Sequence, residues 1–123
     1  MIGYVTIGVK DMEKAKKFYL DLLSDFGVKV LADMGRFALI GSSMEEPCLA
    51  VCIPVNEEDP QPGNGNMVAF NPGSKEKVDV FYHKAIALGG TCEGAPGQRI
   101  PDVFYGAYFR DPDGNKVAFY QFG

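Results

Sequence analysis

Histidine and cysteine, which build many metal and nucleophilic sites, are scarce in this sequence. One histidine, His83, and three cysteines occur among 123 residues. The cysteines, Cys48, Cys52 and Cys92, are odd in number and have no CxxC spacing, which disfavours a disulfide scaffold and a structural zinc site. Unpaired cysteines are typical of a reducing compartment, so we expect the protein to be cytoplasmic.

Basic residues and long apolar runs are also in short supply. Lys and Arg number 12 against 16 Asp and Glu, which gives a net charge of −4 at pH 7. Without a basic field the chain does not attract phosphate backbones, so no nucleic-acid partner is expected. No stretch approaches the ~20 apolar residues of a membrane span, and the apolar start lacks the basic flank of a signal peptide. We therefore expect no membrane partner and a buried strand at the N-terminus.

What the sequence does contain is an internal repeat. The segment VTIGV at residues 5–9 superposes on VAFNP at residues 68–72 with an offset of 63 residues. The same offset brings the Phe-Tyr pair at 18–19 onto the pair at 81–82. A repeat of this length indicates one structural unit that is used twice.

Each copy is predicted to be a module of one domain. The single domain spans residues 1–123, with module 1 at 1–56, a turn-rich linker at 57–65 and module 2 at 66–123. Apolar residues alternate in the expected strands and recur at helical spacing after two helix-capping residues, Asp11 and Ser74. The expected strands are residues 4–9, 28–34, 36–41, 48–54, 67–71, 91–94, 105–110 and 116–121.

The resulting fold class is α+β, with two βαβββ modules that form a curved mixed sheet under outer helices. Between Ala95 and Phe104 the sequence predicts a loop that folds over the open sheet as a lid. Alternation places most strand aliphatics under the helices, so the other face is the candidate site. Its expected lining is Tyr4, Thr6, Ala50, Cys52, Met67, Ala69, Lys116, Ala118 and Tyr120.

The duplicated modules, the opening VTIGVKDMEKAKKFY and the ending YFRDPDGNKVAFY resemble the vicinal oxygen chelate superfamily. That superfamily includes glyoxalase I, bleomycin-resistance proteins, fosfomycin-resistance enzymes and extradiol dioxygenases. The resemblance covers essentially the whole chain. It implies the paired-module fold, a small-molecule site, homodimers and, in some members, a divalent metal ion.

The resemblance implies three metal-ligand positions, and none of them carries a suitable side chain here. The family pattern has His or Gln on the first strand of one module, His on the matching strand of the other, and Glu on the last strand. These positions fall on Tyr4, Met67 and Ala118. A phenol, a thioether and a methyl group do not hold ions that prefer carboxylate, imidazole or thiolate donors. We therefore expect no metal and no other cofactor; the alternative is a divalent ion held by other donors.

Other side chains of interest have more than one interpretation. Arg99 can hold a carboxylate or phosphate in a bidentate fork, or it can stabilise its own loop. Tyr105 can supply a hydroxyl contact or a stacking surface. Cys52 is expected to be a small buried hydrophobe, because the sequence places no histidine or lysine beside it. His83 and Lys116 are expected to face solvent.

Three hypotheses about function are open. The leading one is a metal-free protein that binds a small organic molecule, aromatic or anionic, as bleomycin-resistance-like proteins do, with no catalytic residue. Its ligand-binding residues would be Tyr4, Thr6, Cys52, Met67, Ala118, Tyr120, Arg99 and Tyr105. The alternative is an enzyme of the glyoxalase (lactoylglutathione lyase-like) or extradiol dioxygenase type, metal-dependent or metal-independent. The third is an interaction module whose pocket serves no ligand.

Overall fold

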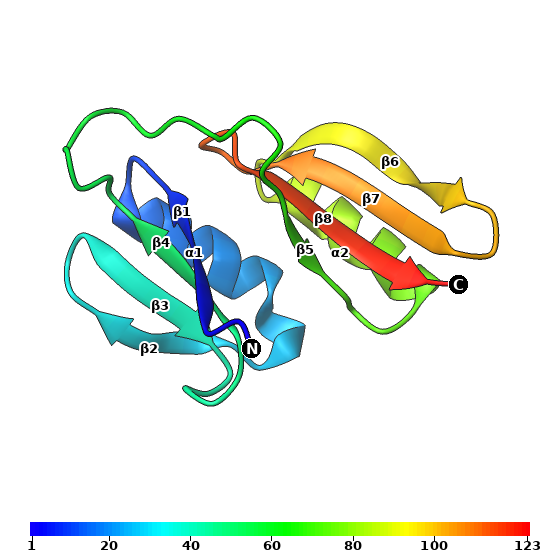
Figure 1. Cartoon of the computed structure of the whole chain (residues 1–123), viewed down its shortest axis with the longest axis horizontal. Helices are drawn as coiled ribbons and strands as arrows, with labels where there is room; N and C mark the ends of the chain where they lie inside the picture. Colours follow the sequence, from blue (N-terminus) through cyan, green and yellow to red (C-terminus); the bar gives the residue numbers. More distant parts are fainter. The chain divides into compact units, whose positions relative to one another are not determined.

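The computed structural model describes residues 1–123 and contains two units with one topology (Figure 1). The first unit, Met1–Pro62, holds five regular elements: β1(Tyr4–Gly8), α1(Met12–Leu22), β2(Lys29–Asp33), β3(Phe37–Gly41) and β4(Cys48–Cys52). A 3-10 helix at Ser24–Phe26 lies between α1 and β2 in the sequence. The second unit, Gly63–Gly123, holds the other five: β5(Val68–Phe70), α2(Lys75–Ala87), β6(Thr91–Ile100), β7(Phe104–Arg110) and β8(Lys116–Phe122).

Each unit forms a four-stranded mixed sheet with the same strand order. The orders are β1-β4-β3-β2 and β5-β8-β7-β6. In both sheets the first and last strands of the unit pair in parallel, and the remaining pairs are antiparallel. A parallel pair needs a crossover connection, which the helix and two intervening strands provide. The predicted α+β fold of two βαβββ modules is confirmed.

The helices show how closely the repeat is kept. Asp11 accepts a hydrogen bond from the backbone N–H of Lys14 at 3.1 Å, and Ser74 accepts the equivalent bond from Lys77 at 3.1 Å. Both are N-caps that satisfy an otherwise free donor of the first turn. The buried helix positions also recur at the offset of the repeat: Ala15, Phe18, Tyr19 and Leu22 in α1, and Val78, Phe81, Tyr82 and Ala85 in α2. Neither helix has the length and apolar character that crossing a membrane would require.

Aromatic packing identifies the face of the second sheet that α2 covers. The ring of Phe119 on β8 lies 5.0 Å from Phe81 of α2, 5.9 Å from Phe70 of β5 and 5.8 Å from Phe109 of β7, measured between centroids. Phe119 and Phe109 are fully buried. Because side chains alternate along a strand, the neighbours of Phe119, Ala118 and Tyr120, belong to the opposite face.

The predicted hairpin between β7 and β8 is present, and one carboxylate organises its turn. Asp111 is 3% exposed and accepts bonds from the backbone N–H groups of Asp113 and Asn115, each at 2.9 Å. It also accepts a bond from the side-chain amide of Asn115 at 3.1 Å. The sequence DPDGN thus fixes the register in which Arg110 lies opposite Lys116.

The expected lid over residues 95–104 is wrong. Most of this segment belongs to β6, which pairs with β7 as far as Ile100 and shows register shifts along the way. Pro96 is tolerated there because β6 is an edge strand and because bulges relieve the ladder of regular pairing. The turn that remains is short, and Asp102 adopts a positive φ of 60° in it.

Candidate functional site

We call the face of each sheet that its helix does not cover the open face. The open face of the first sheet carries Tyr4, Thr6 and Cys52. Thr6 is opposite Ala50, and Ala50 is opposite Leu39 on the next strand. Leu39, Cys48 and Ala50 form a small hydrophobic cluster on this face. The ring of Tyr4 meets that of Phe37 edge to face, with 5.9 Å between centroids. Since Tyr4 and Phe37 are in register with opposite ends of β4, their contact reaches across the middle of this face.

Cys52 has a cationic neighbour that sequence reasoning missed. Nη1 of Arg36 lies 3.1 Å from the Cys52 sulfur and donates to the carbonyl of Ile53 at 2.7 Å. The thiol itself donates to the same carbonyl at 2.9 Å. Arg36 precedes β3, and the pairing of Phe37 with Cys52 brings the two side chains together. That register was the signal that could have revealed the contact.

The open face of the second sheet is aromatic. Ala118 is fully buried and lies between Ala69 on β5 and Tyr108 on β7. Beyond it, Tyr120 stacks on Phe104 with 5.6 Å between centroids and 1° between ring planes. Gly106, opposite Tyr120, leaves the room that the Phe104 ring occupies, since a Cβ there would lie 2.7 Å from that ring. Because glycine has no side chain, the Phe104 ring can lie close to the backbone of Gly106.

Two cations share the ring of Tyr108. The guanidinium carbon of Arg99 and the ammonium nitrogen of Lys116 each lie 5.3 Å from the centroid of that ring. Arg99 also donates to the carbonyl of Ala95. Its guanidinium nitrogens approach Gly94 and Gly97 so closely that a Cβ on either would be 3.1 or 3.2 Å away. Lys116, expected to extend into solvent, is therefore a half-buried member of this face.

Neither of these cations forms an ion pair with a carboxylate. The carboxylate on the adjoining edge strand, Glu93, is engaged by Arg110 at 2.8 Å. The hydrogen bond from Arg110 lowers the pKa of Glu93, because it stabilises the charged form. The charge of Lys116 also lowers the pKa of Glu93, so this carboxylate attracts Lys116 without forming a salt bridge with it, while Arg99 has no carboxylate partner.

Tyr105 lies on the other side of this sheet. Its hydroxyl donates to the Asp79 carboxylate on α2 at 2.6 Å, and the ammonium group of Lys75 lies 5.7 Å from its ring. The bond to Asp79 raises the pKa of Tyr105, because it holds the phenol in its neutral form. The placement of Tyr105 with the open-face residues is corrected accordingly. Ring contacts and alternation place Tyr120 on the open face, and alternation alone places Met67 there beside Ala69.

The single histidine has no role on either open face. His83 is exposed on α2, and its Nδ1 lies 2.7 Å from the backbone oxygen of Asp79. The structure also contains no group of three or more His, Cys, Asp or Glu side chains arranged to hold a metal ion. At the positions of the family ligands, Tyr4, Met67 and Ala118, the phenol, thioether and methyl groups do not fit a divalent ion.

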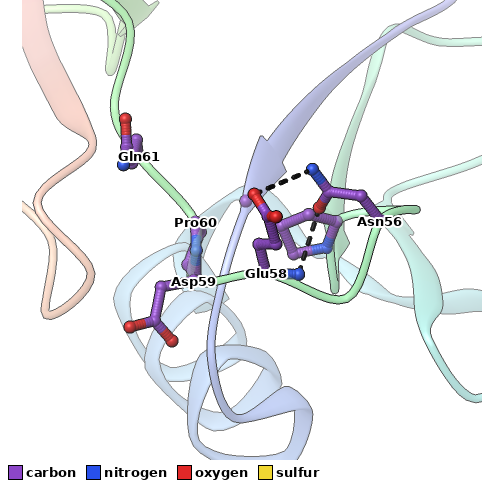
Figure 2. Close-up of a pocket in the computed structure, with 7 residues that line it drawn as sticks. Asn56, Glu58, Asp59, Pro60 and Gln61 are labelled. Carbon is purple, nitrogen blue, oxygen red and sulfur yellow. Dashed lines mark hydrogen bonds between the residues drawn. The ribbon is translucent and has the colours of Figure 1, made fainter.

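A polar pocket of about 320 Å³ lies where the linker meets the first sheet, and none of the expected ligand-binding residues lines it. Figure 2 shows two hydrogen bonds within it: Asn56 Nδ2 donates to Glu58 at 3.4 Å, and the Glu58 N–H donates to Asn56 at 3.1 Å. Gly8 lies close to Pro60, since a Cβ on Gly8 would be 2.9 Å from Cβ of Pro60. Its complete lining is Gly8, Pro54, Asn56, Glu58, Asp59, Pro60 and Gln61. The pocket is thus built by the folding of the linker onto β1.

Comparison with solved structures supports the fold. A glyoxalase/bleomycin resistance protein from Albidiferax ferrireducens T118 is 38% identical, with a TM-score of 0.84 over 98% of this chain and 97% of that one. A glyoxalase/bleomycin resistance protein/dioxygenase family enzyme from Burkholderia phytofirmans PsJN is 22% identical, with a TM-score of 0.78 over 96% and 95%. A genomically encoded fosfomycin resistance protein from Listeria monocytogenes is 19% identical, with a TM-score of 0.74 over 98% and 91%.

The match to a protein-family model covers almost the whole chain. No curated protein matches the sequence. The Glyoxalase family model, which describes the Glyoxalase/Bleomycin resistance protein/Dioxygenase superfamily, matches residues 1–119. With that match and the 38% identical structure, the chain belongs to the glyoxalase/bleomycin resistance protein/dioxygenase superfamily.

Proposed function

We propose that this protein binds a small organic molecule and has lost the metal site of its superfamily. The observation that carries the proposal is the donor set at the three expected ligand positions. Tyr4, Met67 and Ala118 supply a phenol, a thioether and a methyl group, none of which replaces a carboxylate or an imidazole. A site without those donors keeps its shape-dependent and apolar interactions, which are sufficient for binding.

The chemistry of the open faces supports an organic ligand. Tyr4 and Met67 remain 57% and 43% exposed, so both offer apolar surface to a ligand. Methionine is flexible and polarisable, and tyrosine combines a flat ring with a hydroxyl, which suits a partly aromatic molecule. Cys52 and Thr6 add a thiol and a hydroxyl on the first sheet. On the second sheet, Arg99 supplies a donor for an anionic group.

Elemental analysis and thermal unfolding test this proposal together. We expect no stoichiometric metal in purified protein and no rise in melting temperature with Mn²⁺, Fe²⁺, Co²⁺, Ni²⁺ or Zn²⁺. We also expect a saturable rise with some members of a panel of aromatic and anionic compounds, because a ligand that binds only the folded state stabilises it. Stoichiometric metal with a melting temperature sensitive to chelators would instead favour the enzyme hypothesis. The absence of any organic ligand would remove the binding hypothesis.

A further inference from the structure

We propose that Arg99, Tyr108 and Lys116 form an anion-recognition site and that its ligand is an aromatic oxyanion, an aryl carboxylate or aryl phosphate. This inference rests on the proposed function in one respect: it takes the open face of the second sheet as a ligand surface. It adds the class of ligand and two residues, Tyr108 and Lys116, to the proposed binding set.

Two positively charged side chains lie close to one aromatic ring of the second sheet. Arg99 and Lys116 each lie 5.3 Å from the same ring centroid, so their charged groups are at most twice that distance apart. Two like charges repel each other, and the repulsion is weakly screened below a Debye length of about 8 Å and largely screened beyond it. Neither group forms a salt bridge with a carboxylate, although Glu93, whose pKa is lowered chiefly by the bond from Arg110, is also stabilised by the charge of Lys116. A bound anion that contacts both would remove the repulsion and add charge-assisted hydrogen bonds.

Contacts with the backbone of β6 hold the Arg99 side chain in one orientation. Arg99 is held by its bond to the Ala95 carbonyl, and its guanidinium lies against Gly94 and Gly97. Tyr108 is fixed by its register opposite Ala118, which is fully buried, and its Cδ2 would be only 3.0 Å from a Cβ at Gly94. A guanidinium that is already oriented loses less conformational freedom on binding than a free surface side chain. The glycines therefore help to keep the cation in place.

Aromatic rings on the same face as the two cations favour a ligand with an aromatic part. The stacked pair Phe104 and Tyr120 lies on the same face as Tyr108: Phe104 is two alternation steps from Tyr108 along β7, and Tyr120 is one step along β8 from Ala118, which is opposite Tyr108. Phe122 extends this surface, with 5.1 Å between its centroid and that of Tyr120, and its side chain is 64% exposed. Flat rings next to cations suit a molecule whose ring stacks while its oxyanion reaches the charged groups. A free inorganic anion would contact the charged groups and leave the aromatic rings without a partner.

Calorimetric titration of the full chain with phenyl phosphate tests the proposal, with inorganic phosphate and phenol as partial probes. We expect phenyl phosphate to bind more tightly than either partial probe, and its affinity to fall as salt increases, because part of the attraction is between exposed charges. Arg99→Gln and Lys116→Gln should each weaken binding by about tenfold, the cost of losing one hydrogen bond to a charged group. Lys116→Arg should retain most of the affinity, since it keeps the charge.

A matched control uses a lysine in the same unit. Lys77 is exposed on α2, on the helix side of the second unit, so Lys77→Gln removes the same charge without touching the open face. We expect it to leave phenyl phosphate affinity unchanged, and circular dichroism should show that all variants are folded. Equal losses in Lys77→Gln and Lys116→Gln would overturn the proposal, because they would indicate an effect of net charge alone.

Two further outcomes separate this inference from the proposed function. If neutral aromatic compounds bind while phenyl phosphate and benzoate do not, the anion site is wrong and the metal-free binding function stands. If phenyl phosphate binds with an affinity that neither Arg99→Gln nor Lys116→Gln reduces, the anion site is again wrong. If no organic compound binds and stoichiometric metal is found, the proposed function fails as well.

Discussion

The two units share every step of their topology and differ in what their open faces present. Ala50 and Ala118 occupy the same position in the two sheets, each fully buried next to the parallel strand. The residue opposite them is Leu39 in the first sheet and Tyr108 in the second. The open faces have therefore diverged, while the buried positions of the two helices keep the repeat. Packing under a helix constrains size and polarity, whereas an open face is constrained only by what binds to it.

The two units also differ in net charge. The first unit carries the whole net charge of −4, because the second contains equal numbers of acidic and basic residues. On the open faces, Cys48 in the first sheet corresponds to Lys116 in the second. The second unit is thus neutral as a whole but positive on its open face. This contrast favours the second sheet as the place where an anionic group of a ligand is held.

Removal of core aromatic volume should give the largest effect and should differ between the units. Phe119→Ala deletes a fully buried ring that contacts three other phenylalanines, so we expect a loss of about 3–5 kcal/mol in the free energy of unfolding. Val51 has the corresponding place on β4 and is also fully buried. Val51→Ala should cost less, because a smaller cavity remains. Chemical denaturation of both variants provides the measurement, and equal losses would contradict the comparison.

The next largest difference in stability is expected between substitutions in the turns that precede the last strand of each unit. Asp111→Ala leaves up to three donors of the β7–β8 turn without their acceptor, so we expect a loss of about 1–3 kcal/mol. In the turn between β3 and β4, Ser43 Oγ accepts only one long bond, from the Glu45 N–H at 3.3 Å. Ser43→Ala should therefore change stability by less than about 0.5 kcal/mol. A larger loss in Ser43→Ala than in Asp111→Ala would show that the turns have been ranked wrongly.

The helix caps should behave alike, because they occupy equivalent positions of the repeat. Asp11→Ala and Ser74→Ala each remove one capping bond of 3.1 Å, so we expect about 1 kcal/mol from each. The double variant should lose the sum of the two effects, since the caps belong to different units and share no hydrogen-bond partner. Thermal and chemical unfolding would reveal any departure. Strong non-additivity would mean that the caps depend on each other.

The smallest expected effect is the dependence of stability on acidic pH. Hydrogen bonds from Lys16 and from the Gly35 N–H lower the pKa of Asp33 in the first unit, and a bond from Arg110 lowers that of Glu93 in the second. Each carboxylate thus contributes stability above its ordinary pKa, and the contribution is lost as pH falls through the lowered value. Asp33→Asn and Glu93→Gln should each flatten the loss of stability between about pH 5 and pH 2. Identical acid unfolding curves for wild type and variants would contradict this.

Sequence periodicity was sufficient to predict the fold, because the repeat, caps and alternation all agree on one architecture. The same alternation also assigns Tyr105 to the helix side, since it shares its strand face with Phe109 and not with Tyr108. Arg99 was harder to place, because bulges in β6 interrupt the period of two on which such predictions rest. The approach of Lys116 to Tyr108 depends on strand register and rotamer, which a linear pattern does not specify.

The strand order of the first sheet has a consequence for how the chain is made on the ribosome. β1 pairs with β4 and not with any strand of the second unit, so every hydrogen-bonding partner within this sheet precedes Ile53. Nascent chains fold from the N-terminus in units as synthesis proceeds. The first sheet can therefore complete its strand pairing before β5 has emerged from the ribosome, which leaves fewer unpaired strand edges for the second copy of the repeat to pair with incorrectly.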